Sequence, residues 1–458
     1  MKILFVIYQL DFADHISLSF LSAVAKERGH STHLCVLTEV HLEESVKAYK
    51  PDVVAYSTNI YGFDEMVASH KEAKKSHDFV SIMGGPHVTV FPEIFSEVDV
   101  DAFCIGEGEL AFRDFLECLE QDISYDSVPN LITVNSANPV RPLINNLDDL
   151  PFPDRDLVLG NSFLKDTPKK TFYASRGCPY SCNYCCNSYY RSLYRGKGKY
   201  VRRFSVERVI REIEHVKSRY RTDFIKFGDD LFAPKADEWL EEFSDIYSKR
   251  VGIPFNCYLR FDTVDEKLLF LLKKAGCYSV HLSVDSTSEN VRGKILNRKM
   301  KKVDIVRRIK TINDFGINTW VNYMLAAPES TLEDDLLSIS INKKSKVTYA
   351  SYSTTVPMKG TVLYDYCIQH NLIDASTHKS DMEGCSQPTT LKCFSEKEKN
   401  VRYNIYLLGA IIAKLPFPLD KLAIWMIQII PPNKLFVKLR QAFYQYSIEN
   451  RIFKLHLR

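Results

Sequence analysis

The 458-residue sequence predicts an α/β protein with two successive units of alternating strands and helices, followed by a helical region. Three observations support this fold class. Apolar runs of strand length alternate with amphipathic helical patterns over residues 1–140. After a connector rich in Pro, Asn and Asp at 141–170, a second alternation with six strand–helix repeats covers 171–375. Residues 376–458 then change to dense apolar helical patterns.

The first unit has the pattern of a doubly wound parallel sheet. Its strand patterns lie at 2–8, 32–37, 53–57, 80–83 and 102–105, with helical patterns between them. Ligands of such sheets bind beyond the carboxyl ends of the strands. Small residues follow these ends, where backbone without a bulky side chain can approach a large ligand closely. The candidates are Ser57, Thr58, Gly84, Gly85, Gly106 and Gly108.

The second unit has the length and pattern of an open, partial TIM-like barrel with six strand–helix repeats. The predicted strands are Thr171–Ser175, Asp223–Phe227, Phe255–Leu259, Ser279–Val284, Asn318–Leu325 and Tyr349–Thr355. Chemistry in such barrels takes place at the carboxyl ends of the strands. Polar residues gather at those ends, namely Asp229, Asp230, Arg260, Ser283, Asp285 and Ser286.

The C-terminal region has two dense apolar helical patterns, Tyr403–Ala413 and Leu422–Ile430, and basic residues follow them at Lys434, Lys438 and Arg440. One interpretation is a helical cap packed on the barrel. The other is an interfacial face that sits on a membrane or admits an apolar substrate.

Three cysteines lie close together in the segment that follows the first predicted strand of the barrel. Cys178, Cys182 and Cys185 are separated by three and then two residues. Such a loop suits three thiolate ligands of an iron–sulfur cube, and three ligands leave the fourth iron open. A structural zinc site would use four ligands, usually as two separated pairs. The adjacent Cys186 must point differently from Cys185, so we interpret it as a packing residue.

Composition and charge indicate the class of protein and its cellular location. Hydrophobic residues make up 45% and charged residues 26%, which is ordinary for a globular protein. The net charge of +3 does not indicate nucleic-acid binding. No apolar run reaches the roughly 18 residues of a membrane span. The chain opens with a strand pattern rather than a signal peptide, and most of its twelve cysteines lie singly in apolar stretches. We therefore expect a cytoplasmic protein with reduced thiols, or a membrane-associated one by the second interpretation of its C-terminal region.

With the aromatic Tyr184 directly before the third cysteine, the segment resembles the radical S-adenosylmethionine (SAM) superfamily. The resemblance implies that Cys178, Cys182 and Cys185 hold a 4Fe–4S cluster whose open iron binds the amino and carboxylate groups of SAM. It places SAM contacts at the strand-end residues, where Asp285-Ser286 replaces the usual Glu-Ser. The implied SAM contacts are Tyr184 of the cysteine segment and the strand-end residues Asp229, Asp230, Arg260, Ser283 and Asp285.

The first unit resembles the cobalamin-binding domain found in front of many radical SAM enzymes. The matching motifs are Gly84-Gly85-Pro86-His87 and Gly106-Glu107-Gly108-Glu109. Many such domains carry Asp-x-His-x-x-Gly, but here Ala13 and Leu18 replace the aspartate and the glycine. We therefore interpret His15 as a loop histidine rather than a cobalt ligand. The cobalamin contacts implied by the resemblance are Ser57, Thr58, Gly84, Gly85, His87, Gly106 and Glu107.

The combined resemblance implies a cobalamin-dependent radical SAM enzyme. It would cleave SAM reductively to a 5′-deoxyadenosyl radical and methylate an unactivated carbon of a small molecule or lipid. A flavodoxin or ferredoxin would supply electrons. The first alternative is oxidation, cyclisation or rearrangement with the same cofactors and no net methyl transfer. A tRNA methylthiotransferase would need cluster cysteines in loops of its first domain, whereas Cys35 and Cys104 lie in predicted strands. A plain iron–sulfur electron carrier would not need two such units.

Overall fold

The computed structural model describes residues 1–10, 14–300, 303–374 and 384–455, and it forms two compact units. The residues predicted as a connector, 141–170, belong largely to the first unit. This unit comprises Met1–Thr167, Tyr189–Phe204 and His215–Arg221, and the second comprises Pro168–Ser188, Ser205–Glu214 and Thr222–Arg458.

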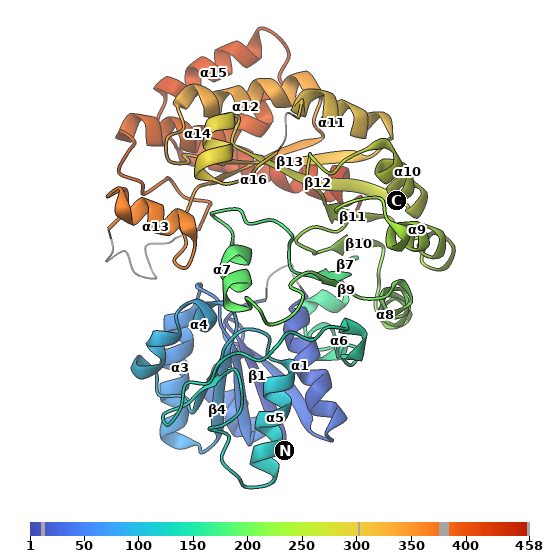
Figure 1. Ribbon diagram of the computed structural model, residues 1–458. Helices are drawn as coiled ribbons and strands as arrows, with labels where there is room; N and C mark the ends of the chain where they lie inside the picture. The colour runs from blue at the N-terminus through green and yellow to red at the C-terminus, as the bar shows by residue number, and fades with distance from the viewer. Residues whose placement is uncertain (11–13, 301–302, 375–383, 456–458) are drawn as a thin grey trace. The chain divides into compact units, whose positions relative to one another are not determined.

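The first unit is built on a six-stranded sheet with the order β2-β1-β3-β4-β5-β6. Two strands of this sheet, β1 and β4, are labelled in Figure 1. The strands are β1 (Lys2–Ile7), β2 (Ser31–Val36), β3 (Val53–Ser57), β4 (Val80–Gly84), β5 (Ala102–Cys104) and β6 (Leu131–Ile132). The helices are α1 (Ile16–Glu27), α2 (Leu42–Tyr49), α3 (Phe63–Ser76), α4 (Pro86–Val90), α5 (Glu109–Glu120) and α6 (Arg155–Leu159). A two-residue strand, β9 (Arg202–Arg203), also belongs to this unit.

The pairing of these strands confirms the predicted doubly wound sheet. Strands β1 to β5 are parallel, and β1 pairs with both β2 and β3, so the strand order reverses there. Helices α1 and α5 contact each other, and α2 and α3 form a second contacting pair. The antiparallel strand β6 was not predicted, because two residues are too short to show alternation.

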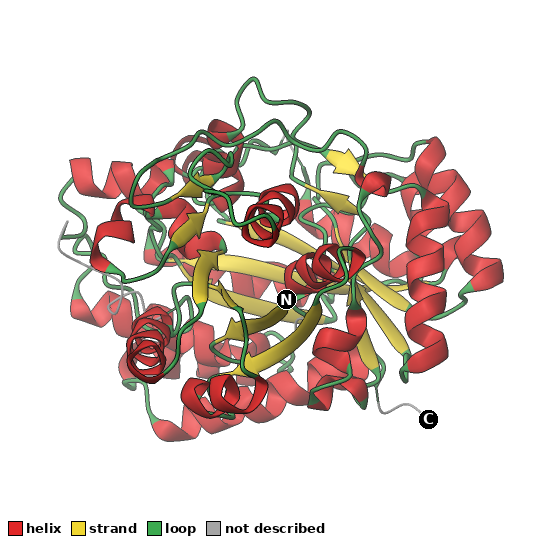
Figure 2. Ribbon diagram, turned by 90° about the horizontal axis from the view of Figure 1, so that it is seen from below, coloured by secondary structure: helices red, strands yellow, loops and turns green. Residues whose placement is uncertain are grey.

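The second unit has a six-stranded, all-parallel sheet in which β7 is followed by β10 to β14 in chain order. This arrangement confirms the open barrel. Figure 2 distinguishes the helices (red) from the strands (yellow) of the whole chain. The strands are β7 (Lys169–Phe172), β10 (Phe224–Phe227), β11 (Phe255–Tyr258), β12 (Cys277–Asp285), β13 (Asn318–Leu325) and β14 (Tyr349–Thr354), with the short β8 (Ser175–Arg176). The helices are α9 (Glu238–Arg250), α10 (Glu266–Ala275), α11 (Ile305–Asp314), α12 (Leu332–Ser345) and α13 (Val362–Gln369), while α7 (Cys186–Leu193) and α8 (Val206–Arg219) each have residues in both units.

Three helices follow the barrel strands: α14 (Glu396–Ile412), α15 (Leu419–Ile429) and α16 (Lys434–Ser447). Helix α14 packs against β14, and α15 and α16 both pack against α14. The helices α14 and α15 begin earlier than their apolar patterns predict. For α14 the reason is a polar N-terminus, where the Ser395 and Glu398 side chains each bond the other's backbone N–H.

The segment after α16 is tied to the beginning of the barrel strands. The Ser279 hydroxyl of β12 donates a hydrogen bond to the Ile452 carbonyl over 2.7 Å. The Phe453 ring lies 5.5 Å from the Phe224 ring and 6.1 Å from the Trp320 ring, measured between centroids. Residues from both ends of the second unit therefore share one apolar cluster.

A buried ion pair joins α14 to α12. The Arg402 guanidinium binds the Asp335 carboxylate over 2.7 Å, and the two side chains are 2% and 5% exposed. Arg402 also donates to the Ser330 carbonyl, and Asp335 accepts from the Ala326 backbone N–H. Burial raises the pKa of Asp335 to about 6, although the Arg402 charge opposes the rise.

Within the described residues, none of the helices combines the length and the apolar character needed to cross a membrane.

Candidate functional site

The three motif cysteines lie in the loop between β8 and α7. Cys182 is buried, and Cys178 and Cys185 are half-buried. Burial raises the pKa of Cys178 to about 11, and the charges of Asp230, Cys185 and Cys182 add to the rise. The Cys185 backbone N–H donates to the Cys182 carbonyl over 3.2 Å, so the loop makes a turn between the second and third cysteines.

Three cysteines are a donor set that suits an iron–sulfur cluster, and the surroundings of Cys185 favour its thiolate form. The pKa of Cys185 is lowered to about 6, first by the Cys186 thiol and also by Asn187, whose side-chain amide lies 3.7 Å from the sulfur. The thiolate is the form that binds metal. Among the described residues, no three His, Cys, Asp or Glu side chains are arranged to bind a single metal ion. In an iron–sulfur cluster each thiolate binds a different iron, so the three cysteines need not converge on a single metal ion.

A polar network connects the cysteine loop to the end of β12. The Tyr184 hydroxyl donates to the Asp285 carboxylate over 2.7 Å, although the two residues are 101 positions apart. Asp285 has a φ of 63°, and the pairing of β12 with β13 shifts register between Ser283 and Asp285. This kink accompanies the approach of the carboxylate to Tyr184 and to the Ser283 hydroxyl, which also donates to it.

Arg298 completes the network and was not predicted. Its Nε lies 2.5 Å from the Asp285 carboxylate, and its Nη2 donates to the Ser283 carbonyl over 2.9 Å. Its Nη1 lies 4.0 Å from the Cys182 sulfur and donates to the Tyr184 oxygen over 3.2 Å. Arg298 follows an irregular segment with no motif, so the sequence offered no signal for it.

The structure gives Arg260 a partner within its own loop. Its guanidinium forms a fork with Asp262, with distances of 2.9 and 3.2 Å, and stacks 3.6 Å from the centre of the Tyr180 ring. Its Nη1 lies 3.9 Å from the Cys182 sulfur. Arg260 therefore lies at the cysteine loop, and its predicted pairing with the SAM carboxylate stays a prediction.

The two aspartates after β10 differ in their surroundings. Asp229 is buried and accepts hydrogen bonds from the Ala174 backbone N–H, over 3.0 Å, and from the Ser175 hydroxyl. Burial raises its pKa to about 6. Asp230 is exposed, and its charge acts on the Cys178 thiol. Asp229 thus fixes the backbone before the cysteine loop, whereas Asp230 is accessible to a ligand.

A ladder of rings crosses the sheet of the second unit. Tyr258, His281 and Trp320 are register partners on β11, β12 and β13. The ring centroids of Tyr258 and His281 are 4.5 Å apart, and those of His281 and Trp320 are 4.0 Å apart. Lys226 of β10 lies 5.4 Å above the Tyr258 ring. His281 and Ser283 are two residues apart on one strand, so the half-buried ladder shares a face with Ser283.

The first unit has a cavity of about 110 Å³ at the carboxyl ends of its strands. Gly85 has a φ of 105°, and a Cβ there would lie 2.5 Å from the Thr58 carbonyl oxygen. Thr58 holds this turn, since its backbone N–H and hydroxyl both donate to the Gly84 carbonyl over 2.8 Å. The lining includes Ser17, Leu21, Ser57, Gly84, Gly85, Cys104, Gly106, Gly108 and Glu109.

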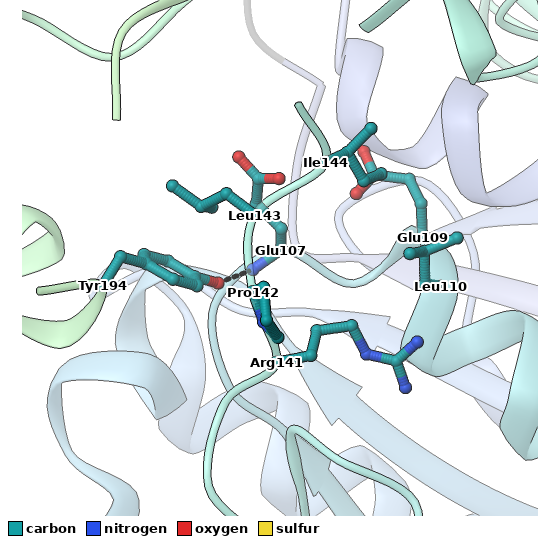
Figure 3. Close-up of a pocket in the computed structure, with 8 residues that line it drawn as sticks. All are labelled: Glu107, Glu109, Leu110, Arg141, Pro142, Leu143, Ile144 and Tyr194. Carbon is teal, nitrogen blue, oxygen red and sulfur yellow. Dashed lines mark hydrogen bonds between the residues drawn. The ribbon is translucent and has the colours of Figure 1, made fainter. Parts of the chain in front are cut away.

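Glu107 and His87, which the sequence also predicts as cobalamin contacts, are held by other residues of the protein. The Glu107 backbone N–H donates to the Tyr194 hydroxyl over 2.6 Å, beside a small cavity (Figure 3). Its carboxylate forms an ion pair with Arg202. The His87 ring packs between the rings of Phe63 and Phe91, at 4.2 and 4.9 Å, and the residue is buried.

His15 lies at the start of α1, where it has a φ of 37° and makes no capping hydrogen bond through its side chain. Ala13, which replaces the aspartate of the histidine motif, lies outside the described residues.

Two known families match the chain. The "Radical SAM superfamily" matches residues 172–336, which include the three cysteines, and the "B12 binding domain" matches residues 11–116. The chain therefore contains a radical SAM domain and a B12-binding domain. The cofactors that these two domains imply are a 4Fe–4S cluster, SAM and cobalamin, as the sequence predicts.

This chain is similar to several known proteins, among them two relatives by sequence and one solved structure. The "Uncharacterized methyltransferase PH0819" of Pyrococcus horikoshii is 28% identical over 345 residues, which are 74% of each chain. The "Anaerobic magnesium-protoporphyrin IX monomethyl ester cyclase" of Rubrivivax gelatinosus is 23% identical over 345 residues, 69% of this chain and 59% of that one. The solved structure of the "radical S-adenosylmethionine methyltransferase, TsrM" from Kitasatospora setae has a TM-score of 0.70 at 14% identity and covers 98% of each chain.

Gly85 at the cavity of the first unit allows a test against a second glycine that lies outside the cavity. Gly85→Ala forces a positive φ and a backbone clash, which should cost about 2–4 kcal/mol and displace the loop. We expect the variant to retain little corrinoid when it is loaded with hydroxocobalamin, desalted and measured by absorption. Gly293→Ala is the control, because Gly293 does not line the cavity and a Cβ there would have no neighbour within 4 Å. Equal melting temperatures and equal corrinoid retention in the two variants would contradict the assigned role of Gly85.

Proposed function

We propose that this protein is a cobalamin-dependent radical SAM methyltransferase that methylates an unactivated carbon of a small-molecule substrate. One observation carries the proposal: a B12 binding domain precedes the radical SAM region in one chain. Its support comes from relatives and neighbours named as methyltransferases, such as PH0819 and TsrM. A small electron-transfer protein, flavodoxin or ferredoxin, is the expected reductant, and a lipid is the other substrate class that the sequence allows.

The described residues have distinct tasks in this proposal. Cys178, Cys182 and Cys185 hold the cluster, and Asp229 fixes the backbone that leads into their loop. When bound, the cluster with SAM supplies radical chemistry and cobalamin supplies a transferable methyl group. The bonds among Tyr184, Asp285 and Arg298 fix the loop against the end of β12. This preorganisation limits the movement of the site during reaction.

The ring ladder of Tyr258, His281 and Trp320 supports substrate binding on the same face of the sheet. Its members are half-buried, and Trp320 also packs against the apolar cluster around Phe453. Burial lowers the pKa of His281 to about 3, and the Lys226 charge lowers it further, so the imidazole is neutral at pH 7. A neutral imidazole can donate one hydrogen bond and accept one, while the flat rings offer stacking area. Lys226 adds positive charge at one end of the ladder.

The second candidate is oxidation, cyclisation or rearrangement with the same cofactors and no net methyl transfer. The relative that is named as a cyclase favours it. Nothing in the described cysteine loop distinguishes the two outcomes, because both begin with the same cleavage of SAM. The mass of the product separates them, since methylation adds one CH₂ unit.

The test uses protein reconstituted anaerobically with iron, sulfide and hydroxocobalamin. It is incubated with a reductant, SAM carrying a deuterated methyl group, and a small-molecule extract of the source cells. We expect a product whose mass rises by one deuterated methyl group in place of hydrogen, together with 5′-deoxyadenosine. Formation of 5′-deoxyadenosine with a changed but unlabelled product would establish the second candidate. Absence of SAM cleavage in protein with a complete cluster would contradict both.

A further inference from the structure

The outer face of α15 carries a stripe of large apolar side chains. Leu419, Leu422, Met426 and Ile429 recur every three or four residues, which places them along one side of the helix. Leu422 is 52% exposed and Ile429 56% exposed, and Trp425 beside them is 57% exposed. Phe417, in the loop before the helix, is 77% exposed. We call these six residues the α15 stripe.

The stripe is not needed to hold α15 on the protein. The opposite face already anchors the helix, because Ile427 is buried and α15 packs against α14. The Asn404 side chain of α14 donates to the Ile427 carbonyl over 2.9 Å and to the Ile430 carbonyl over 2.7 Å. A helix that is apolar on two faces normally has a partner on each. A second contact is therefore expected on the outer face.

The charge around the stripe selects the kind of partner. Residues 399–448 contain seven Lys or Arg residues and a single acidic residue, Asp420. Two of the seven are already paired within the protein, Lys399 with Glu396 and Arg402 with Asp335, whereas Lys421, Lys434 and Lys438 are exposed. Asp420 is buried and bound by Lys343, so it leaves the surface without a compensating negative charge from this segment. Lys421 and Lys434 are exposed and lie within and just after the stripe in the sequence. Aliphatic and Trp side chains combined with lysines are typical of helices that lie in the interface of an anionic membrane.

We propose that the α15 stripe docks this protein on the surface of an anionic lipid bilayer. The helix lies in the plane of the interface, with its apolar side chains among the upper acyl chains and with Lys421 and Lys434 at the headgroups. With 11 residues, α15 is far too short to cross the bilayer. The proposal does not depend on the reaction that the barrel performs.

The experiment is flotation of the full-length, cluster-containing protein with vesicles. One set is pure phosphatidylcholine, and the other contains roughly one-third phosphatidylglycerol to give a negative surface. We expect binding to the second set only, and release at about 0.5 M salt, where surface charge is screened within a few ångströms. Equal binding to both sets, or no binding to either, would overturn the proposal.

Two variants identify the surface. Trp425→Ser should lower the partition coefficient at least about tenfold, because it removes a large interfacial ring. Phe270→Ser is the control, because Phe270 is 59% exposed on α10 and lies outside the stripe. Lys421→Gln and Lys434→Gln should each weaken binding about fivefold at low salt. Because all four side chains are exposed, the variants should keep the melting temperature of the parent protein.

Further results of these experiments would overturn the proposal that the α15 stripe docks on lipid. If Trp425→Ser floats as well as the parent protein, or if Phe270→Ser loses binding equally, the stripe is not the docking surface. Light scattering in the absence of vesicles tests self-association. A dimer that Trp425→Ser converts to a monomer would assign the stripe to an interface between two copies and would overturn the lipid proposal.

Discussion

Replacing Cys182 with alanine is expected to abolish SAM cleavage and to lower the iron content to that of unreconstituted protein. The buried sulfur of Cys182 is one of the three predicted thiol ligands, and both Arg260 and Arg298 approach it within 4.0 Å. Without it, one iron of the cluster lacks its protein ligand. The measurements are the iron and sulfide content, the electron paramagnetic resonance spectrum of the reduced protein with and without SAM, and the yield of 5′-deoxyadenosine.

Cys186→Ala is the matched control for the cluster variant. Cys186 is exposed, so its interpretation from the sequence as a packing residue is wrong. It lies directly after the third motif cysteine and shares a hydrogen bond with it. The variant should keep its cluster and its spectral response to SAM, because an open iron requires only three protein ligands. If instead Cys186→Ala loses the cluster while Cys182→Ala retains it, the assignment of ligands is wrong, and so is the open iron.

Replacing Arg402 with alanine is expected to destabilise the second unit by about 3–5 kcal/mol, because it leaves the buried Asp335 carboxylate unpaired. Thermal or denaturant unfolding of the protein would measure the loss. Lys399→Ala is the control on the same helix. Its ion pair with Glu396, at 2.8 Å, involves a carboxylate that is 83% exposed, so the loss should stay below about 0.5 kcal/mol. Equal losses of stability in the two variants would show that burial does not set the strength of the Arg402–Asp335 ion pair.

The Arg402 variant should also change how stability depends on pH. Asp335 has a pKa of about 6 in the folded protein, above its usual range. The folded state thus binds the proton more tightly than the unfolded state. The contribution of the Asp335 carboxyl to stability therefore falls as the pH rises from about 4, the usual pKa of Asp, to about 6. Removing the Arg402 charge raises the pKa further. The loss caused by Arg402→Ala should therefore be larger at pH 8 than at pH 5.

The fold could be predicted because parallel strands in both units leave regular apolar runs separated by helical patterns. The cysteine motif could be predicted because its ligands are close together in sequence. Arg298 could not, since it reaches Asp285 and Cys182 from a loop without a motif. The ring ladder was missed for a different reason. Aromatic residues within strands are normally interpreted as core, and only the register of β11, β12 and β13 places Tyr258, His281 and Trp320 in one row.

Several predicted contacts stay predictions because the structure occupies those side chains otherwise. Arg260 is paired with Asp262, and His87 is packed between two phenylalanine rings. Glu107 is bound to Arg202. Spacing along a chain indicates which strand end a residue occupies, but it carries no information on the neighbour that a side chain selects there.

The hydrogen bond from Ser279 to the Ile452 carbonyl affects the order in which the chain acquires structure during synthesis. The sheet of the first unit uses residues 2–132 and can assemble early on the ribosome. The apolar cluster around Phe224 needs Ile452 and Phe453, which are translated more than 200 positions later. Until then, nascent barrel strands expose surface that chaperones recognise, so this protein should depend on them more through its second half than through its first.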